Sequence, residues 1–110
     1  MIDWDRVQDL SDEIGPDAFG EVVELFLEEV DVEIDKLRQI TDRIALESQL
    51  HFLKGSALNL GFAAFAELCH RGEVAAVAGQ QNTVDIAAIL TCYDRSKSMF
   101  LSDLGRVIAA

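Results

Sequence analysis

The chain has 110 residues, a length that fits one domain with its own core and no need of a metal or disulfide staple. Twenty acidic residues against nine basic ones give a net charge of −11, which repels phosphate backbones and anionic lipid and argues against nucleic acid and membrane surfaces as partners. No apolar run approaches the roughly 20 residues that cross a bilayer, and the acidic start is unlike a signal peptide. We therefore expect a single cytoplasmic domain over residues 1–110.

Two helices are expected in the first third of the chain. Asp3 can cap a short helix that runs to about Ile14, where Gly15 and Pro16 end it and start the next. Residues 17–40 then form a long amphipathic helix, because apolar side chains recur every three or four positions while glutamates occupy the other faces. Its apolar positions are Phe19, Val22, Val23, Phe26, Leu27, Val30, Ile34 and Leu37.

Three further helices follow. Thr41 and Asp42 offer caps for a third helix that ends near Gly61, and a fourth follows at once and ends at Gly79. Residues 83–107 carry the last apolar stripe, which Ser96 and Lys97 interrupt. The apolar positions of that stripe are Ile86, Leu90, Tyr93, Phe100, Leu104 and Val107.

The fold class follows from this order of elements. No segment shows the alternation of a strand, and the long helices are joined by short turns. The sequence predicts an all-α fold, an antiparallel up-down-up-down four-helix bundle with a short additional N-terminal helix. Cys69 and Cys92 fall on apolar faces of different helices without CxxC spacing, so we expect reduced core cysteines and no metal site.

The most informative segment runs from His51 to Gly61 on the third helix. Its core stripe is expected at Leu46, Leu50, Leu53, Ala57 and Leu60, spaced by four and three. His51 lies on the neighbouring stripe and should border solvent.

Two neighbours of His51 suggest chemistry. Lys54, three residues on, places a cation beside the imidazole, where it can offset the charge of a phosphoryl group. Gly55, four residues on, costs about 1 kcal/mol inside a helix but clears space for a second protein. A histidine imidazole, with an unperturbed pKa near 6.5, offers a mostly neutral nitrogen nucleophile. The pattern therefore indicates a phosphorylatable histidine.

At these residues the chain resembles the histidine-containing phosphotransfer (HPt) domains of multistep two-component signalling. The likeness is carried by His51, Leu53, Lys54, Gly55, Ser56 and Gly61, with Phe65 and Cys69 at further family-like positions. It extends over nearly the whole chain, since Ile2-Asp3-Trp4 and the helix with Glu24-Leu-Phe-Leu-Glu-Glu29 look like the family's first two helices. The chain departs from the pattern at Gln49-Leu50, at Ala57 and at Gly72, where the family commonly has alanine, serine and leucine.

The resemblance implies further site residues. Phosphoryl-accepting His51 and charge-supporting Lys54 would be the catalytic pair, and the residues expected to contact partners are Ser48, Phe52, Gly55 and Leu58. If the third and fourth helices pair about the turn at Gly61, residues 70–73 lie level with His51, so His70, Arg71 and Glu73 are possible borders of the site. In the resembled family the position of Glu73 often holds a polar residue near the phosphoryl site. A carboxylate there suits the neutral imidazole better than the phosphorylated one. His70 itself lacks a glycine four residues on and is interpreted as structural or solvated.

The resemblance also implies a mechanism. His51 would exchange a phosphoryl group reversibly with an aspartate of a response-regulator receiver domain, or receive it from a histidine kinase or hybrid kinase. The Mg²⁺ for that reaction is expected on the receiver. The chain has no P-loop and no glycine-rich nucleotide boxes, so we expect a carrier without kinase or nucleotide-binding activity of its own, and with no cofactor of its own. A monomer is the simplest state for such a carrier.

Three alternatives stay open. The phosphoacceptor domain of a chemotaxis-type histidine kinase has a similar His-x-x-Lys-Gly run, although a chain that ends at Ala110 without a linker favours a free-standing module. A helical adaptor that is never phosphorylated would keep the same fold. A di-metal carboxylate enzyme needs two Glu-x-x-His pairs, and only Glu67 with His70 supplies one.

Overall fold

The structure is a computed structural model that describes residues 1–109, with side chains through residue 105. Its helices are α1 (Trp4–Ile14), α2 (Pro16–Arg38), α3 (Leu46–Leu60), α4 (Ala63–Val77), the short 3₁₀ helix η1 (Gln81–Thr83) and α5 (Ile86–Ala109). The part of the chain described contains no strand, which confirms the all-helical prediction. Val107, assigned to the last apolar stripe, lies outside the described side chains.

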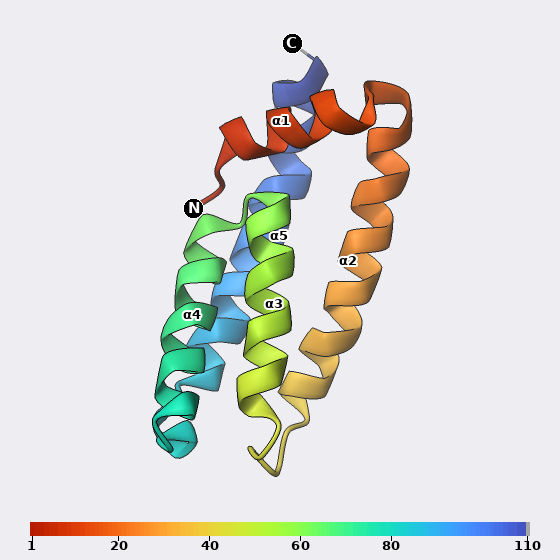
Figure 1. Cartoon of the computed structure of the whole chain (residues 1–110). Helices are drawn as coiled ribbons and strands as arrows, with labels where there is room; N and C mark the ends of the chain where they lie inside the picture. The colour runs from red at the N-terminus through yellow and green to blue at the C-terminus, as the bar shows by residue number, and fades with distance from the viewer. Residues whose placement is uncertain (110) are drawn as a thin grey trace.

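The four long helices run side by side, and α1 lies across one end of them (Figure 1). From that end α2 runs away, α3 returns, α4 runs away again and α5 returns (Figure 1). The contact between α3 and α4 is the most extensive in the molecule, while α2 lies on the other side of α3. No helix in residues 1–109 is long and apolar enough to cross a membrane.

The turns at both ends of α1 form as expected. Asp3 accepts a hydrogen bond from the Arg6 backbone N–H at 3.2 Å, and α1 ends at Ile14 before Gly15. Gly15 has a φ of 96°, a conformation that favours glycine, and Pro16 opens α2 with its φ already suited to a helix.

The start of α3 differs from the prediction. The helix begins at Leu46 after Ala45, which has no capping side chain, so Thr41 and Asp42 are not its caps. The Asp42 carboxylate instead accepts from the Ile44 backbone N–H at 3.0 Å, which closes a tight local turn. Because this turn competes with the helix, α3 starts later than predicted. The preceding helix α2 ends at Arg38 rather than near Ile40.

The turn from α3 to α4 anchors the N-terminus of the chain. Gly61 has a φ of 80°, and a Cβ there would lie 2.6 Å from the Asp3 carbonyl oxygen. That approach lets the Asp3 N–H donate to the Gly61 carbonyl at 2.7 Å. Only glycine fits this position, which therefore fixes α1 over the end of α3.

The five residues predicted as the core stripe of α3 are all buried. Leu46, Leu50 and Leu53 have no exposed surface, and Ala57 and Leu60 are nearly as enclosed. Gly72 is also buried, and a Cβ there would lie 2.7 Å from a methyl carbon of Leu50. The leucine that the family often has at position 72 is thus replaced by a close approach between α3 and α4.

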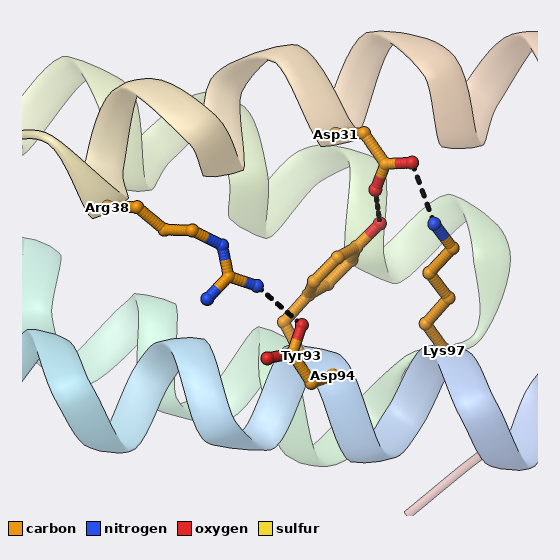
Figure 2. Close-up of polar contacts among 5 residues, drawn as sticks. All are labelled: Asp31, Arg38, Tyr93, Asp94 and Lys97. Atoms are coloured by element: carbon orange, nitrogen blue, oxygen red, sulfur yellow. Dashed lines mark hydrogen bonds and ion pairs between the residues drawn. The ribbon is translucent and has the colours of Figure 1, made fainter.

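A polar cluster joins α2 to α5 (Figure 2). The hydroxyl of buried Tyr93 donates to one oxygen of Asp31 at 2.5 Å, and Lys97 pairs with the other at 2.7 Å. Two turns beyond Asp31 on α2, Arg38 pairs with Asp94 of α5 at 2.6 Å. Lys97, expected to interrupt the stripe of α5, therefore contributes to the contact between the two helices.

Candidate functional site

His51 stands on the solvent-facing side of α3. Buried leucines of the same helix hold this part of α3 against the core, so the backbone that carries His51 is firmly packed. The His51 side chain is 71% exposed, which confirms the prediction that it borders solvent. Its position fits a group that must be reached by another macromolecule.

Glu73 of α4 reaches across to both predicted site residues of α3. One of its carboxylate oxygens lies 3.0 Å from Nδ1 of His51, and the other lies 2.9 Å from Nζ of Lys54. The Glu73 side chain is only 16% exposed and that of Lys54 21%, so this ion pair is largely enclosed beneath the exposed ring. The structure therefore brings together His51, Lys54 and the residue expected only at the border.

The contacts of Glu73 determine its charge. Hydrogen bonding to Lys54, and next to His51, holds the pKa of this carboxyl below its ordinary value. It is ionised at neutral pH, and an ionised carboxylate can only accept hydrogen bonds. Nδ1 of His51 must then be the donor in this contact, which leaves the unprotonated nitrogen of a neutral ring at Nε2. The electron pair of Nε2 is the one free to attack.

Gly55 has no packing reason inside the molecule. A Cβ at this position would meet no atom within 4 Å, whereas a Cβ at Gly61 or Gly72 would collide with its neighbours. The cost of a mid-helix glycine is therefore not repaid within the chain.

The side chains expected to contact partners differ in their surroundings. Leu58 is 58% exposed and Phe52 is 41% exposed, so both present apolar surface on α3 near His51. Ser48 is exposed too, but its hydroxyl donates at 3.0 Å to the carbonyl of Ala45, the residue before α3. Of this set, Phe52 and Leu58 offer apolar surface and Gly55 offers space.

A groove runs beside Lys54 between α3 and α4. Its volume is about 340 Å³, and its lining is made of Lys54, Leu58, Ala63, Ala66, Glu67 and His70. His70 therefore borders the site, as expected. Arg71 is not among the residues that line this groove, although it pairs at 3.0 Å with Glu67, which does line it.

The two cysteines are not reactive groups of the site. Burial, followed by its neighbours Cys92 and Glu73, raises the pKa of the Cys69 thiol to about 12, so it stays protonated. Cys92 is half-buried and free, with its sulfur 3.9 Å from the Ser96 hydroxyl. Over residues 1–109, no group of three or more His, Cys, Asp or Glu side chains could hold a metal ion.

Reasoning from the sequence missed the cluster of Asp31, Tyr93 and Lys97. A tyrosine on a core stripe needs a partner for its hydroxyl, and this signal could have directed attention to the acids of α2. The sequence does not say which acid, because the choice depends on how α2 is rotated against α5.

The chain was compared with family models, with curated proteins and with solved structures. No curated protein and no solved structure matched the chain. The family model of the Hpt domain matches residues 21–99, which include α3, α4 and every predicted site residue. The chain thus belongs to the Hpt domain family and has a phosphotransfer role in two-component signalling.

Proposed function

We propose that this protein carries a phosphoryl group on Nε2 of His51 and exchanges it with the aspartate of a response-regulator receiver domain. The observation that carries the proposal is the exposed imidazole whose Nδ1 contacts the Glu73 carboxylate at 3.0 Å. This contact favours the tautomer with a free electron pair on Nε2, on the ring that is open to a partner.

The proposed step moves one phosphoryl group between two proteins. The Nε2 electron pair forms the N–P bond while the P–O bond to the receiver aspartate breaks, and the departing carboxylate keeps the bonding electrons. The imidazole gains positive charge but keeps its Nδ1 proton, and Glu73 stabilises that ring charge through the same hydrogen bond. The expectation from the sequence that a carboxylate disfavours the phosphorylated ring therefore applies to the phosphoryl oxygens and not to the ring itself. No proton needs to leave during transfer.

Lys54 has a second role in this scheme. A lone carboxylate next to the ring would repel the oxygens of the incoming phosphoryl group. Because the Lys54 ammonium lies 2.9 Å from Glu73, the pair adds little net charge beside the ring. Lys54 therefore supports phosphoryl transfer largely by neutralising Glu73.

We assign the remaining chemistry to the partner. Phosphoryl transfer depends on alignment and charge neutralisation, and a typical receiver brings Mg²⁺ and a lysine for this purpose. The carrier acts as a monomer, and its up-down-up-down helical bundle is a rigid support for the site. Its docking surface consists of Ser48, Phe52, Gly55 and Leu58. Such a surface is small and suits a transient complex. A histidine kinase or hybrid kinase supplies the phosphoryl group to the relay.

The direct test is incubation with a phosphorylated receiver domain and Mg²⁺, followed by intact mass measurement before and after acid treatment. We expect an acid-labile phosphoryl group on the wild type and none on His51→Gln. His70→Gln is the matched control, because it removes the second histidine of the chain, which lines the groove beside Lys54, and it should be labelled like the wild type.

Two outcomes would contradict the proposal. Labelling of folded His51→Gln would place the phosphoryl group elsewhere. Failure of a panel of phosphorylated receivers to label the folded wild type would favour an adaptor that docks partners without accepting phosphate.

A further inference from the structure

The charges of this chain are divided between two parts of the molecule. Residues 1–35, which hold α1 and most of α2, carry 13 acids and one base, Arg6, for a net charge of −12. The other 75 residues carry seven acids and eight bases, for a net charge of +1. The acidity of the protein is therefore a property of its α1–α2 side, while the part with His51 is close to neutral.

Apolar side chains lie within this acidic side. Leu25 is 59% exposed and Val32, seven residues on and thus on the same face of α2, is 55% exposed. Beside them a shallow groove of about 310 Å³ is lined by Val22, Leu25, Phe26 and Glu29. We call this surface the α2 outer face, defined as Val22, Leu25, Phe26 and Val32 with Glu21, Glu28 and Glu29.

The glutamates around these apolar residues make no hydrogen bond or ion pair with the side chains that the structure describes. Asp31 and Glu33, elsewhere on α2, pair with Lys97 and Lys36. In contrast, none of the four glutamates at 21, 24, 28 and 29 makes a hydrogen bond or ion pair within the described residues. Like charges three or four residues apart destabilise a helix, so this row lowers the stability of the free protein.

We propose that the α2 outer face binds a basic amphipathic helix of another protein. Cations on such a helix would pair with the glutamates, and its apolar side chains would cover Leu25 and Val32 and enter the groove. The face suits a helix because α2 is 23 residues long, about 35 Å, and its two exposed anchors stand two turns apart. A second copy of this chain is a poor occupant, since it would bring another acidic α2 against the first.

This inference does not depend on the chemistry of His51. No residue of the α2 outer face lines the groove beside Lys54, and α2 lies on the opposite side of α3 from α4 (Figure 1). A partner on α2 could hold the protein near its relay while the histidine is used by others.

The test uses the whole chain and a synthetic 18-residue peptide of leucine and lysine patterned as an amphipathic helix. We expect chemical shift changes in amide NMR spectra to centre on residues 21–32, with an affinity that falls as salt is raised. A peptide with glutamate in place of lysine should not bind.

The chain offers a matched pair of variants for this test, because Leu25 and Leu58 are 59% and 58% exposed. Leu25→Ser should weaken peptide binding roughly tenfold, whereas Leu58→Ser should leave it unchanged. Glu28→Gln with Glu29→Gln should reduce the salt dependence, and thermal unfolding confirms that each variant is folded. Shift changes centred on His51 and Leu58, equal effects of the two leucine variants, or no binding would each overturn the proposal.

Discussion

Two carboxylates in this molecule make nearly the same pair of contacts. Glu73 of α4 bonds a ring nitrogen and a lysine of α3, and Asp31 of α2 bonds a ring hydroxyl and a lysine of α5. The difference lies in the ring. His51 is 71% exposed, while Tyr93 is 2% exposed and surrounded by aromatic core residues. The bonding pattern alone does not make a site, and exposure of the ring decides which cluster can react.

The two rings also respond differently to their carboxylates. Burial, followed by the hydrogen bond to Asp31, raises the pKa of Tyr93 above its ordinary value, so the phenol stays neutral and inert. At the other cluster the carboxylate keeps the proton on Nδ1 and leaves Nε2 available. We therefore expect changes at Glu73 to alter phosphoryl transfer and changes at Asp31 to alter stability.

Among the variants that keep His51, Glu73→Gln is expected to have the largest effect on transfer. The amide can also donate to Nδ1, which would place the imidazole proton on Nε2, so the rate of phosphoryl acceptance should fall about ten- to a hundredfold. Initial rates with a phosphorylated receiver measure this effect. Glu67→Gln is the control, because Glu67 is on the same helix and, among the described residues, pairs only with exposed Arg71. Equal rates for the two variants would mean that Glu73 does not set the tautomer.

Asp31→Ala is expected to have the opposite profile. It leaves the buried Tyr93 hydroxyl without an acceptor, so the free energy of unfolding should fall by about 1–2 kcal/mol in denaturant titrations. Asp35→Ala, an exposed acid one turn on without a hydrogen bond or ion pair among the described residues, should change it by less than about 0.5 kcal/mol. A loss of phosphoryl acceptance in folded Asp31→Ala would break the distinction between the two clusters.

Gly55→Ala separates stability from function in a single substitution. The new Cβ meets no atom within 4 Å, so the free protein should become more stable by about 0.5–1 kcal/mol. Transfer should nevertheless slow, because the methyl group occupies space next to His51 that a docked receiver needs. Gly20→Ala on α2 has equally open space and should give the gain in stability without the loss of rate. Unchanged transfer in Gly55→Ala would remove this glycine from the docking surface.

Local patterns in the sequence predicted much of the fold and of the site. The spacing of leucines on α3 identified its buried face, and the same spacing placed His51 towards solvent. The nearness of Glu73 to His51 could be predicted because α3 and α4 are joined by a tight turn at Gly61. Residues at similar distances from this turn, one on each helix, lie level with each other.

Other features depend on information that a local pattern does not hold. The predicted start of α3 was wrong because the Asp42 side chain can either cap a helix or close a tight turn. The sequence does not show which of these two it does. The partner of Tyr93 is 62 residues away, on a helix with several acids. Only the packing of α2 against α5 selects Asp31.

The smallest expected effect is the pH dependence of stability, and it should differ in direction between the clusters. The pKa of Glu73 is lowered by folding, so its contribution to stability is fully present at pH values above its pKa in the unfolded chain, about 4.3. The contribution is lost as the pH falls through the pKa of Glu73 in the folded protein. The pKa of Tyr93 is raised by folding, so its contribution is present below about pH 10 and is lost as pH rises further.

Unfolding midpoints of the wild type, Glu73→Gln and Tyr93→Phe across this range measure both contributions. The difference between the wild type and Glu73→Gln should shrink only in acid, and that between the wild type and Tyr93→Phe only in alkali. A Glu73→Gln difference that persists far below pH 4 would mean that the carboxylate acts by packing and not by charge. In that case Nδ1 of His51 would not be obliged to hold the proton, because only an ionised carboxylate requires a donor there.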